Sequence, residues 1–397
     1  MRILLIHNFY KQAGGEDTVF HAEAALLQGH GHTVEKLALS NNEVNTIGEK
    51  LMAALGVVYN YGSARTVENA LLRFQPDVVH VHNFFPLVSP AVFYVCQKHR
   101  VPVVLTLHNY RLLCPSAVLH YNGKVQLENI HKTFPLRAIA KGIYRNSRIE
   151  TASVVLTTGI HKMLGTWQHK VDRYIALTPG AADLFLDSSL RLRPEQLAIK
   201  PNFTEDLGEG APDREDAYIY IGRLAPEKGI ETLLQAHQLQ PFKLRIIGDG
   251  PLRGQVERYA ANNPSVTYMG FRKREETMQL LKKAKALIFP SEWLETFGMT
   301  VIEAFATGTP VIAANLGGAA HLVKDQHNGL HFAPQQPTAL THCVQELELK
   351  PNFREELGKN ARATYLRHYT PEANYQLLLQ VYKDVIRQKK RPAPTTV

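Results

Sequence analysis

Short apolar runs alternate with amphipathic segments along most of the chain. The runs Arg2–His7, Pro76–His82 and Val101–Thr106 have the length and the β-branched content of buried strands. Between such runs, apolar positions recur at helical spacing, as in the segment from about Thr18 to Gly29. Strands that alternate with helices predict an α/β protein whose parallel sheets carry helices on both faces.

The same pattern continues in two blocks, which predicts two domains. Val154–Thr158 and Tyr174–Thr178 are predicted to be the last strands of a first domain over residues 1–204. Residues 205–216 are polar and contain Gly and Pro, which is typical of a linker between domains. A second domain is predicted over residues 217–370.

Composition agrees with two soluble globular domains. The chain has 397 residues, of which 45% are hydrophobic and 20% are charged. The first apolar run is too short for a signal peptide or a membrane span, so a cytoplasmic protein is predicted and any membrane role must be peripheral. Three cysteines without a close pair give no disulfide or zinc framework and fit a reducing compartment: Cys96, Cys114 and Cys343.

Positive charge is concentrated in the first half. Residues 1–175 hold 18 Lys and Arg against 11 Asp and Glu, a net of +7, whereas the remainder holds 27 against 25, a net of +2. A basic half indicates an anionic partner such as a membrane surface, a phosphorylated acceptor or nucleic acid. A solvated basic face is an equally good interpretation.

The segment 124–148 contributes much of this charge, with six Lys and Arg and one Glu. From Pro135 onward its apolar and basic residues fall at helical spacing, so a helix with one apolar face and basic flanks is predicted. Such a helix can lie on an anionic membrane surface. Alternatively, Leu136, Ile139 and Ile143 pack into the core and only the charges are exposed.

The stretch 290–311 carries the clearest chemistry. Glu295 lies in a predicted loop and Glu303 in a predicted helix, Met299–Ala306, which begins after Gly298. The oxygens of a carboxylate accept hydrogen bonds from a pair of sugar hydroxyls, and the start of a helix offers unpaired N–H groups to phosphate. The stretch therefore predicts a nucleotide-sugar site.

A second candidate lies where a strand ends before the predicted helix Ile230–Gln238. The segment G-R-L-A-P-E-K-G places Arg223 and Lys228 in one loop. Two cations there suit a diphosphate, because Arg is a planar fork and Lys a point charge. An exposed basic loop is the alternative.

Strand ends in the first half carry further polar residues. His80 and His82 lie on one face of a strand, so a metal site must be considered, but the sequence shows no third ligand. His108 follows another strand, at the edge where open α/β sheets bind ligands. Gly14 and Gly15 precede a helix and let backbone amides approach a ligand.

These motifs carry a family resemblance. The pattern E-x7-E followed by E-A-F-A-T-G-T-P-V-I, together with G-R-L-A-P-E-K-G, resembles the signature of the retaining glycosyltransferases of family 4, also called group 1. The resemblance covers nearly the whole chain and implies the GT-B fold, in which two Rossmann-like, doubly wound domains face each other across a cleft. The first domain then binds the acceptor, the second binds the nucleotide-sugar, and the helix over 371–390 returns to the first domain.

The resemblance also assigns residues to roles. Glu295 meets the transferred sugar and Glu303 the ribose, while Arg223 and Lys228 stabilise the departing diphosphate and His108 lies near the sugar. The implied catalytic residues are His108, Arg223, Lys228 and Glu295. The implied donor-binding residues are Gly14, Gly15, Gly222, Gly248, Gly250, Phe271, Thr296, Phe297, Gly298, Met299 and Glu303.

Two positions depart from the family pattern. His321 stands where the family commonly has Glu, which bears on the donor sugar. A subgroup with a similar first half carries several cysteines where this chain has Gln126 and Glu128–Ile130, and only Cys114 remains. Any cysteine-based structure of that subgroup is therefore absent here.

The predicted function is transfer of a sugar from a nucleoside-diphosphate sugar, most often a UDP-sugar, to a glycan or lipid-linked acceptor in bacterial polysaccharide or glycolipid synthesis. No metal and no cofactor is expected, because the chain has no D-x-D motif and the family needs no bound metal. No nucleic acid partner is predicted. The alternatives are a non-hydrolysing UDP-sugar epimerase of the same fold and a catalytically silent nucleotide- or glycan-binding protein.

Overall fold

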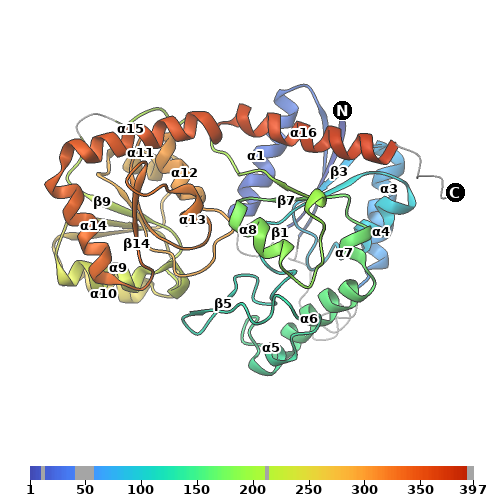
Figure 1. Cartoon of the computed structure of the whole chain (residues 1–397), viewed down its shortest axis with the longest axis horizontal. Coiled ribbons are helices and arrows are strands. Elements are labelled where there is room, and N and C mark those ends of the chain that lie inside the picture. The colour runs from blue at the N-terminus through green and yellow to red at the C-terminus, as the bar shows by residue number, and fades with distance from the viewer. Residues whose placement is uncertain (10–13, 41–57, 211–213, 391–397) are drawn as a thin grey trace. The chain divides into compact units, whose positions relative to one another are not determined.

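The computed structural model describes residues 1–9, 14–40, 58–210 and 214–390, and it divides into two compact units (Figure 1). The first unit comprises residues 1–119, 126–201 and the chain from residue 375 onward. The second comprises residues 120–125 and 202–374. Each unit is built around its own parallel sheet, as the alternating pattern predicts.

The first sheet has the order β2-β1-β3-β4-β7-β8, and all its neighbouring strands are parallel. Its strands are β1 (Arg2–Phe9), β2 (Thr33–Ser40), β3 (Val78–Val81), β4 (Val103–Thr106), β7 (Arg173–Ala176) and β8 (Leu197–Ile199). The helices between them are α1 (Gly15–Gly29), α3 (Tyr61–Phe74), α4 (Ala91–Lys98), α5 (Leu136–Lys141), α6 (Arg148–Met163), α7 (Thr166–His169) and α8 (Pro179–Leu186), with a short 3-10 turn, η2 (Pro194–Gln196). Sequence order reverses between β1 and β3, so ligands are expected at their carboxyl ends.

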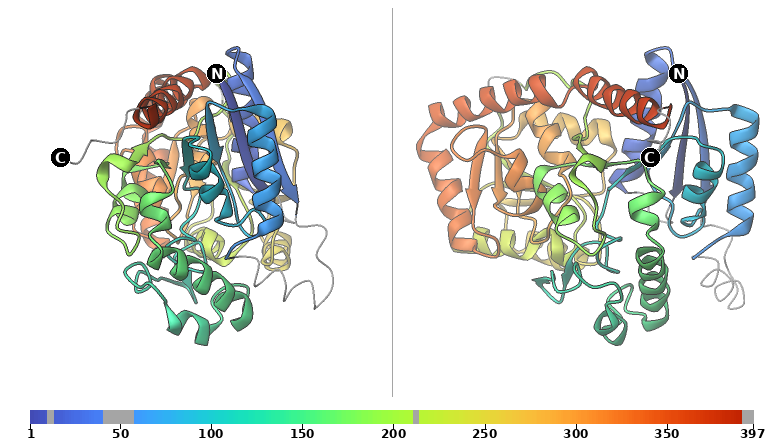
Figure 2. Two further views of the ribbon diagram at one scale, coloured as in Figure 1. Left: turned by 90° about the vertical axis from the view of Figure 1, so that its right-hand side faces the viewer. Right: turned by 45° about the vertical axis from the view of Figure 1, so that its right-hand side comes forward.

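The last helix, α16 (Pro371–Lys390), completes the core of the first unit. Its residues Leu378 and Tyr382 are fully buried against Ile3, Leu5 and Phe20 of β1 and α1. Figure 2 shows this red helix across the blue elements at the start of the chain. Burial of these side chains ties the end of the chain to its beginning.

One predicted strand of the first domain is wrong. Residues Val154–Thr158 lie inside α6, whose N-cap Ser147 accepts a hydrogen bond from the Glu150 N–H at 3.2 Å. The run V-V-L-T-T has high β propensity, but Thr157 and Thr158 hydrogen-bond back to carbonyls four residues earlier, as threonines in helices do. Tertiary packing of the buried face overrides the local preference.

The amphipathic helix predicted from Pro135 onward is also interrupted. The helix α5 has six residues and stops at Gly142, whose φ of +60° is left-handed, and α6 begins only at Arg148. Leu136 is 67% exposed, whereas Ile139 and Ile143 are half-buried. The predicted apolar face is therefore divided between solvent and core.

The second sheet has the order β11-β10-β9-β12-β13-β14 and is also fully parallel. Its strands are β9 (Tyr218–Ile221), β10 (Leu244–Ile247), β11 (Val266–Gly270), β12 (Leu287–Phe289), β13 (Val311–Ala314) and β14 (Gly329–Phe332). The connecting elements are η3 (Pro226–Lys228), α9 (Ile230–Leu239), α10 (Arg253–Ala261), α11 (Arg274–Lys283), α12 (Met299–Ala306), α13 (Gly317–Leu322), α14 (Pro337–Leu349) and α15 (Pro351–His368). This is the strand order of a doubly wound dinucleotide-binding sheet, with its switch point between β9 and β12.

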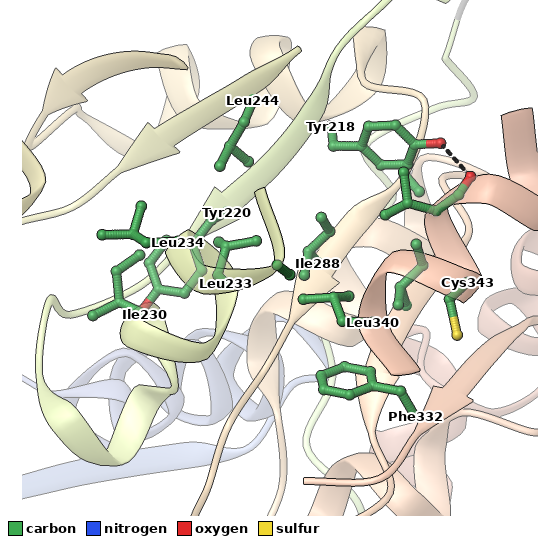
Figure 3. Close-up of a cluster of buried hydrophobic side chains, with 14 of the residues drawn as sticks. Tyr218, Tyr220, Ile230, Leu233, Leu234, Leu244, Ile288, Phe332, Leu340 and Cys343 are labelled. Carbon is green, nitrogen blue, oxygen red and sulfur yellow. Dashed lines mark hydrogen bonds between the residues drawn. The ribbon is translucent and has the colours of Figure 1, made fainter. Parts of the chain in front are cut away.

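One face of this sheet packs against α9 and α14 (Figure 3). Leu233 of α9 and Leu340 of α14 are fully buried against Ile288 of β12. Tyr218 is also buried, and its hydroxyl donates to the Val344 carbonyl at 3.3 Å, the bond drawn dashed in Figure 3. The core thus fixes β9 and β12, whose carboxyl ends carry the candidate site.

Two segments join the second unit in ways that the sequence pattern does not predict. The described part of the predicted linker 205–216 packs on this unit, because the Arg214 guanidinium donates to the Thr307 and Gly308 carbonyls at 3.0 and 2.8 Å, at the end of α12. A two-stranded hairpin, β5 (His120–Tyr121) and β6 (Lys124–Val125), belongs here as well.

Candidate active site

The predicted site residues of the second unit gather at its switch point. Arg223 and Lys228 follow β9, and Glu295 follows β12, so loops distant in sequence meet beside adjacent strands. The glycines at the neighbouring turns permit close packing. A Cβ on Gly248 would lie 1.8 Å from the Gly222 carbonyl oxygen, and one on Gly250 would lie 2.5 Å from that of Leu224. These two turns therefore require glycine because neighbouring backbone segments pack directly against them, whatever ligand they bind.

Glu295 and Lys228 form a direct ion pair. Three side-chain donors converge on Glu295 Oε1: Lys228 Nζ at 2.7 Å, Ser291 Oγ at 2.6 Å and Trp293 Nε1 at 3.1 Å. The Lys228 ammonium also lies 5.1 Å from the centre of the Trp293 ring. An ammonium has three N–H donors, so a lysine held here by Glu295 keeps donors for an anionic ligand.

Arg223 lies in the same loop but in a different environment. Its side chain is 56% exposed and pairs with Glu227, which lies four residues later. Because solvent screens an exposed pair, Arg223 is held less firmly than Lys228. The loop is therefore predicted to contribute one fixed and one adaptable cation.

Glu303 lies on α12 as predicted, but its carboxylate already has a partner. Arg274, the first residue of α11, donates to Glu303 Oε1 and to Thr204 Oγ1, the latter at 2.9 Å. Burial raises the pKa of Glu303, and the Arg274 charge opposes that shift. Its predicted bond to a ribose stays a prediction, and a ligand would have to share the carboxylate with Arg274.

The Glu303→Gln variant is expected to bind a free nucleoside diphosphate roughly 10- to 100-fold more weakly, and Glu295→Gln to lose less. A charge-assisted hydrogen bond contributes roughly 1.5–3 kcal/mol. Calorimetric titration with free UDP measures both. Arg274→Ala is the control: an equal loss there would show that Glu303 acts by holding Arg274, and unchanged affinity in Glu303→Gln would remove the ribose role.

The remaining predicted donor contacts fall into buried and exposed groups. Thr296, Phe297 and Gly298 are buried at the start of α12, and Met299 is half-buried. Phe271, just after β11, is 76% exposed, and its predicted contact with the donor stays a prediction. His321 is exposed on α13.

Gly317 and Gly318, at the start of α13, lie against the Glu295 loop. A Cβ on Gly317 would lie 2.6 Å from the Glu295 nitrogen, and one on Gly318 would lie 2.0 Å from the Phe297 carbonyl oxygen. The Gly318 N–H donates to the Glu295 carbonyl at 2.7 Å. These glycines hold the Glu295 loop in place, a role that the sequence alone did not assign.

In the first unit, the start of α1 forms a polar cluster with the end of β1. Gly14 and Gly15 are exposed, as a ligand-facing loop requires, but the Gly14 N–H donates to Asp17 Oδ2 at 2.9 Å. Asp17 Oδ1 lies 2.7 Å from His7 Nε2. The contact of Gly14 and Gly15 with a donor stays a prediction, and in this structure the first of the two amides serves the helix cap.

Glu16 is a functional candidate that the sequence analysis missed. It accepts hydrogen bonds from Asn83 Nδ2 at 3.2 Å and Asn109 Nδ2 at 3.4 Å. Burial is the main cause that raises the pKa of Glu16 to about 7, and the nearby Asp17 charge acts in the same direction. The Arg111 charge opposes this shift. A carboxyl that titrates near neutrality is characteristic of functional sites.

The Glu16→Gln variant is expected to be stabilised relative to wild type at pH 8 but not at pH 4.5. The folded protein holds the Glu16 proton more tightly than an ordinary glutamate, whose pKa is 4.5. The bound proton therefore stabilises the folded state. This stabilisation is fully present below pH 4.5 and is lost as the pH rises through about 7. Thermal unfolding midpoints across this range measure it. The exposed Glu355→Gln should show no such gain at pH 8, and a parallel pH profile in Glu16→Gln and wild type would contradict the assignment.

His108 lies at the end of β4 and lines a small pocket with Asn83, Phe85, Asn109 and Arg111. Its Nε2 lies 3.1 Å from His82 Nδ1, and the two rings stack with centroids 5.2 Å apart. Burial lowers the pKa of both imidazoles well below the ordinary value, so both are neutral at pH 7. The pocket wall is thus built from neutral histidines beside amides and an arginine.

A buried charged cluster lies behind His82. Glu23 and Lys200 are both fully buried and form an ion pair, with Lys200 Nζ 2.5 Å from Glu23 Oε1. Glu23, His80 and His82 place potential ligand atoms within 4.8 Å of one another, so Glu23 is the third potential ligand that the sequence did not reveal. Lys200 already neutralises Glu23, and both ring nitrogens of His80 have hydroxyl partners, Tyr382 and Thr106, each at 2.7 Å. These partners favour a hydrogen-bonded network over a metal centre.

Open parallel sheets bind their ligands where the strand order reverses, and both sheets of this chain carry polar groups at that point. Two family models match this chain in succession. The model "Glycosyltransferase Family 4" matches residues 13–204, and "Glycosyl transferases group 1" matches residues 204–364. The chain belongs to this glycosyltransferase family and has the GT-B fold.

Curated relatives cover most of the chain at low identity. An uncharacterized glycosyltransferase of Methanocaldococcus jannaschii is 26% identical over 316 residues, which is 77% of this chain and 75% of the relative. The D-rhamnosyltransferase WbpZ of Pseudomonas aeruginosa is 29% identical over 309 residues, 72% of this chain and 80% of the relative. Both relatives are named as glycosyltransferases, and only the second name specifies a sugar.

Solved structures agree on the fold. Anabaena HepE in complex with UDP has a TM-score of 0.68 at 18% identity, covering 97% of this chain and 100% of that chain. Sucrose-phosphate synthase of Thermosynechococcus elongatus has a TM-score of 0.72 at 19% identity, covering 98% of this chain and 99% of that chain. At such identities the likeness shows the fold alone.

Proposed function

We propose that this chain is a retaining, metal-independent glycosyltransferase that moves a sugar from a UDP-sugar to a glycan or lipid-linked acceptor. One observation carries the proposal: Lys228 is paired with Glu295 at the switch point of the second sheet. A fixed cation beside a carboxylate suits a donor whose diphosphate gains charge as it leaves and whose sugar offers hydroxyls. The UDP bound to Anabaena HepE supports a uridine donor for the same fold.

Transfer would need little covalent chemistry from the protein. Lys228 and Arg223 would stabilise the leaving diphosphate, while Glu295 holds a sugar hydroxyl and fixes Lys228. An acceptor hydroxyl would attack from the face that the diphosphate leaves, and a diphosphate oxygen would take its proton. The bond from the anomeric carbon to the diphosphate oxygen breaks as the bond to the acceptor oxygen forms, which retains the anomeric configuration.

A panel of nucleotide-sugars, each incubated with and without glycan or lipid-linked acceptors, tests the proposal. We expect UDP release that depends on the acceptor, survives EDTA, and gives a product whose anomeric configuration by NMR equals that of the donor. Conversion of the sugar without acceptor would indicate an epimerase, and binding without turnover a silent binding protein. An inverted product or loss of activity in EDTA would overturn the mechanism.

We further propose that the acceptor is reached at an anionic membrane surface on the cytoplasmic face, through α5 and α6. In the described residues, no helix has the length and apolar content needed to cross a bilayer, so contact would be peripheral. Ile149, Leu156 and Met163 are 75%, 49% and 72% exposed and lie seven residues apart, so α6 presents them on one side. Figure 2 shows the two green helices side by side.

Basic residues flank this apolar surface. Exposed cations lie on α5, on the turn that follows it and at the first residue of α6: Arg137, Lys141, Arg145 and Arg148. Their pairs are weak: Lys141 lies 3.3 Å from Glu128, and Arg145 lies 3.4 Å from Glu150. Apolar side chains surrounded by solvated cations complement an anionic lipid surface.

Wild type is expected to co-sediment with phosphatidylglycerol vesicles and not with phosphatidylcholine vesicles. Each basic residue near the surface contributes about 1 kcal/mol, so an Arg137/Lys141/Arg145 triple alanine variant should bind roughly 100-fold more weakly. The double change Ile149→Ser and Met163→Ser should also reduce binding. Leu349→Ser, at an 81% exposed leucine of the second unit, is the matched control. Equal and negligible binding to both lipids would leave a soluble acceptor instead.

A further inference from the structure

Two buried polar atoms in the first unit face each other without a hydrogen bond. Within the described residues, neither Glu23 Oε2 nor His82 Nε2 has a hydrogen-bond partner, although both are shielded from solvent. They lie 3.5 Å apart. A buried polar group left unpaired is destabilising, so each atom is the natural partner of the other.

The chemistry of this pair determines where the protons lie. A carboxylate only accepts, so His82 Nε2 must carry the hydrogen that points at Glu23. Because burial holds His82 neutral by lowering its pKa, its Nδ1 is then an acceptor. That atom lies 3.1 Å from His108 Nε2, which must therefore be the N–H donor.

We propose that Glu23 and His82 form a positioning relay that fixes His108 in the Nε2–H tautomer and leaves Nδ1 of His108 as a hydrogen-bond acceptor. Lys200 completes the relay by balancing the charge of Glu23 through its 2.5 Å contact. His80 supports the arrangement from β3, just before His82, with its own nitrogens engaged by Tyr382 and Thr106. This deepens the proposed function, and rests on it for the role of His108 at the sugar.

The consequence is a restriction on what His108 does. An imidazole with an unprotonated Nδ1 accepts a hydrogen bond from a hydroxyl, and it does not donate a proton to a leaving group through that atom. In the reaction proposed above, His108 therefore orients a hydroxyl of the sugar or the acceptor. The other tautomer would point two lone pairs at each other between His82 and Glu23.

Nitrogen-15 NMR of histidine-labelled protein tests the tautomer without any assay of activity. The His108 ring is identified by the signals lost in His108→Ala. We expect a protonated Nε2 and an unprotonated Nδ1 for His108, and a protonated Nε2 for His82. A His108 ring protonated at Nδ1, or one mole of tightly bound zinc per mole of protein that is lost in Glu23→Gln, would overturn the relay.

Two substitutions of His82 separate positioning from structure. His82→Asn can place its amide oxygen about where Nδ1 stands and still accept from His108, whereas His82→Phe cannot. We expect kcat to fall roughly 10- to 100-fold in His82→Phe and much less in His82→Asn, since loss of a group that orients a histidine has effects of this size. Affinity for UDP should be unchanged in both, and equal kcat in the two variants would contradict the relay.

The charged pair behind His82 needs its own variant. Glu23→Gln alone strands the buried Lys200 charge and can unfold the protein, so the test uses the neutral double variant Glu23→Leu with Lys200→Met, which leaves no acceptor opposite His82 Nε2. In the folded double variant, the fixed tautomer of His108 should be lost, with both ring nitrogens giving averaged shifts. A fixed tautomer there would overturn the role of Glu23. If the NMR result holds while wild type transfers no sugar, the relay stands and the proposed function fails.

Discussion

Replacing Lys228 with alanine is expected to lower kcat roughly 100- to 1,000-fold, with a much smaller change in the apparent affinity for the donor. Charge on the diphosphate grows as the bond to the sugar breaks, so a fixed cation stabilises the transition state more than the bound donor. Lys228 is held for this purpose by Glu295 at 2.7 Å and by the Trp293 ring. Steady-state kinetics with varied donor measures both parameters.

Two further variants test whether the fall in kcat is specific to Lys228. Arg223→Ala should shift kcat in the same direction by a smaller factor, because Arg223 is 56% exposed and shared with Glu227. Lys243 directly precedes β10, is 66% exposed and pairs with Asp216. Lys243→Ala should leave kcat and KM unchanged. An effect of Lys228→Ala confined to KM would mean that Lys228 binds the ground state and the transition state equally.

The central stretch of the second unit was predictable because its signals are local. The predicted helix Met299–Ala306 agrees with α12 to the residue. Gly298 begins the helix with a φ of +158°, and Gly308, with a φ of +64°, ends it before Pro310. Each boundary depends on a residue type whose backbone preference is strong in any context.

The partners of the site residues could not be predicted in the same way. Lys200 pairs with Glu23 across 177 positions of sequence, and Arg274 reaches Glu303 across 29. Such pairs depend on which strand ends the fold brings together, and charge or spacing gives no local sign of them. One weak signal existed: Glu23 and Lys200 fall within apolar surroundings, where a charge is rare unless paired.

The segment around α5 shows the limit of periodicity. Apolar and basic residues at helical spacing are equally compatible with one long helix and with two helices separated by a turn. Gly142 has a left-handed φ of +60°, which ends the first helix and produces two helices separated by a turn. Arg145 and Asn146, in that turn, also have positive φ. The exposed apolar stripe consequently lies on α6, outside the segment 124–148 that the sequence singled out.

His108→Ala is expected to reduce sugar transfer by at least about 100-fold while the affinity for free UDP stays at the wild-type value. His108 belongs to the first unit, whereas the charged residues proposed to hold the diphosphate and ribose, Arg223, Lys228 and Glu303, belong to the second. Loss of one well-placed polar group at a reacting centre lowers kcat by about this factor. Turnover with the donor found in the nucleotide-sugar panel, and calorimetry with UDP, measure the two quantities.

The double variant His108→Ala with His82→Phe tests whether the two histidines act together. If His82 acts only by orienting His108, removing both rings should lower kcat no further than removing His108 alone, because the two act as one unit. The exposed His342→Ala, on α14, is the control for a general effect of losing a histidine. Additive losses in the double variant would mean that His82 acts on the reaction independently of His108. Parallel losses of UDP affinity and turnover in His108→Ala would instead place His108 in nucleotide binding.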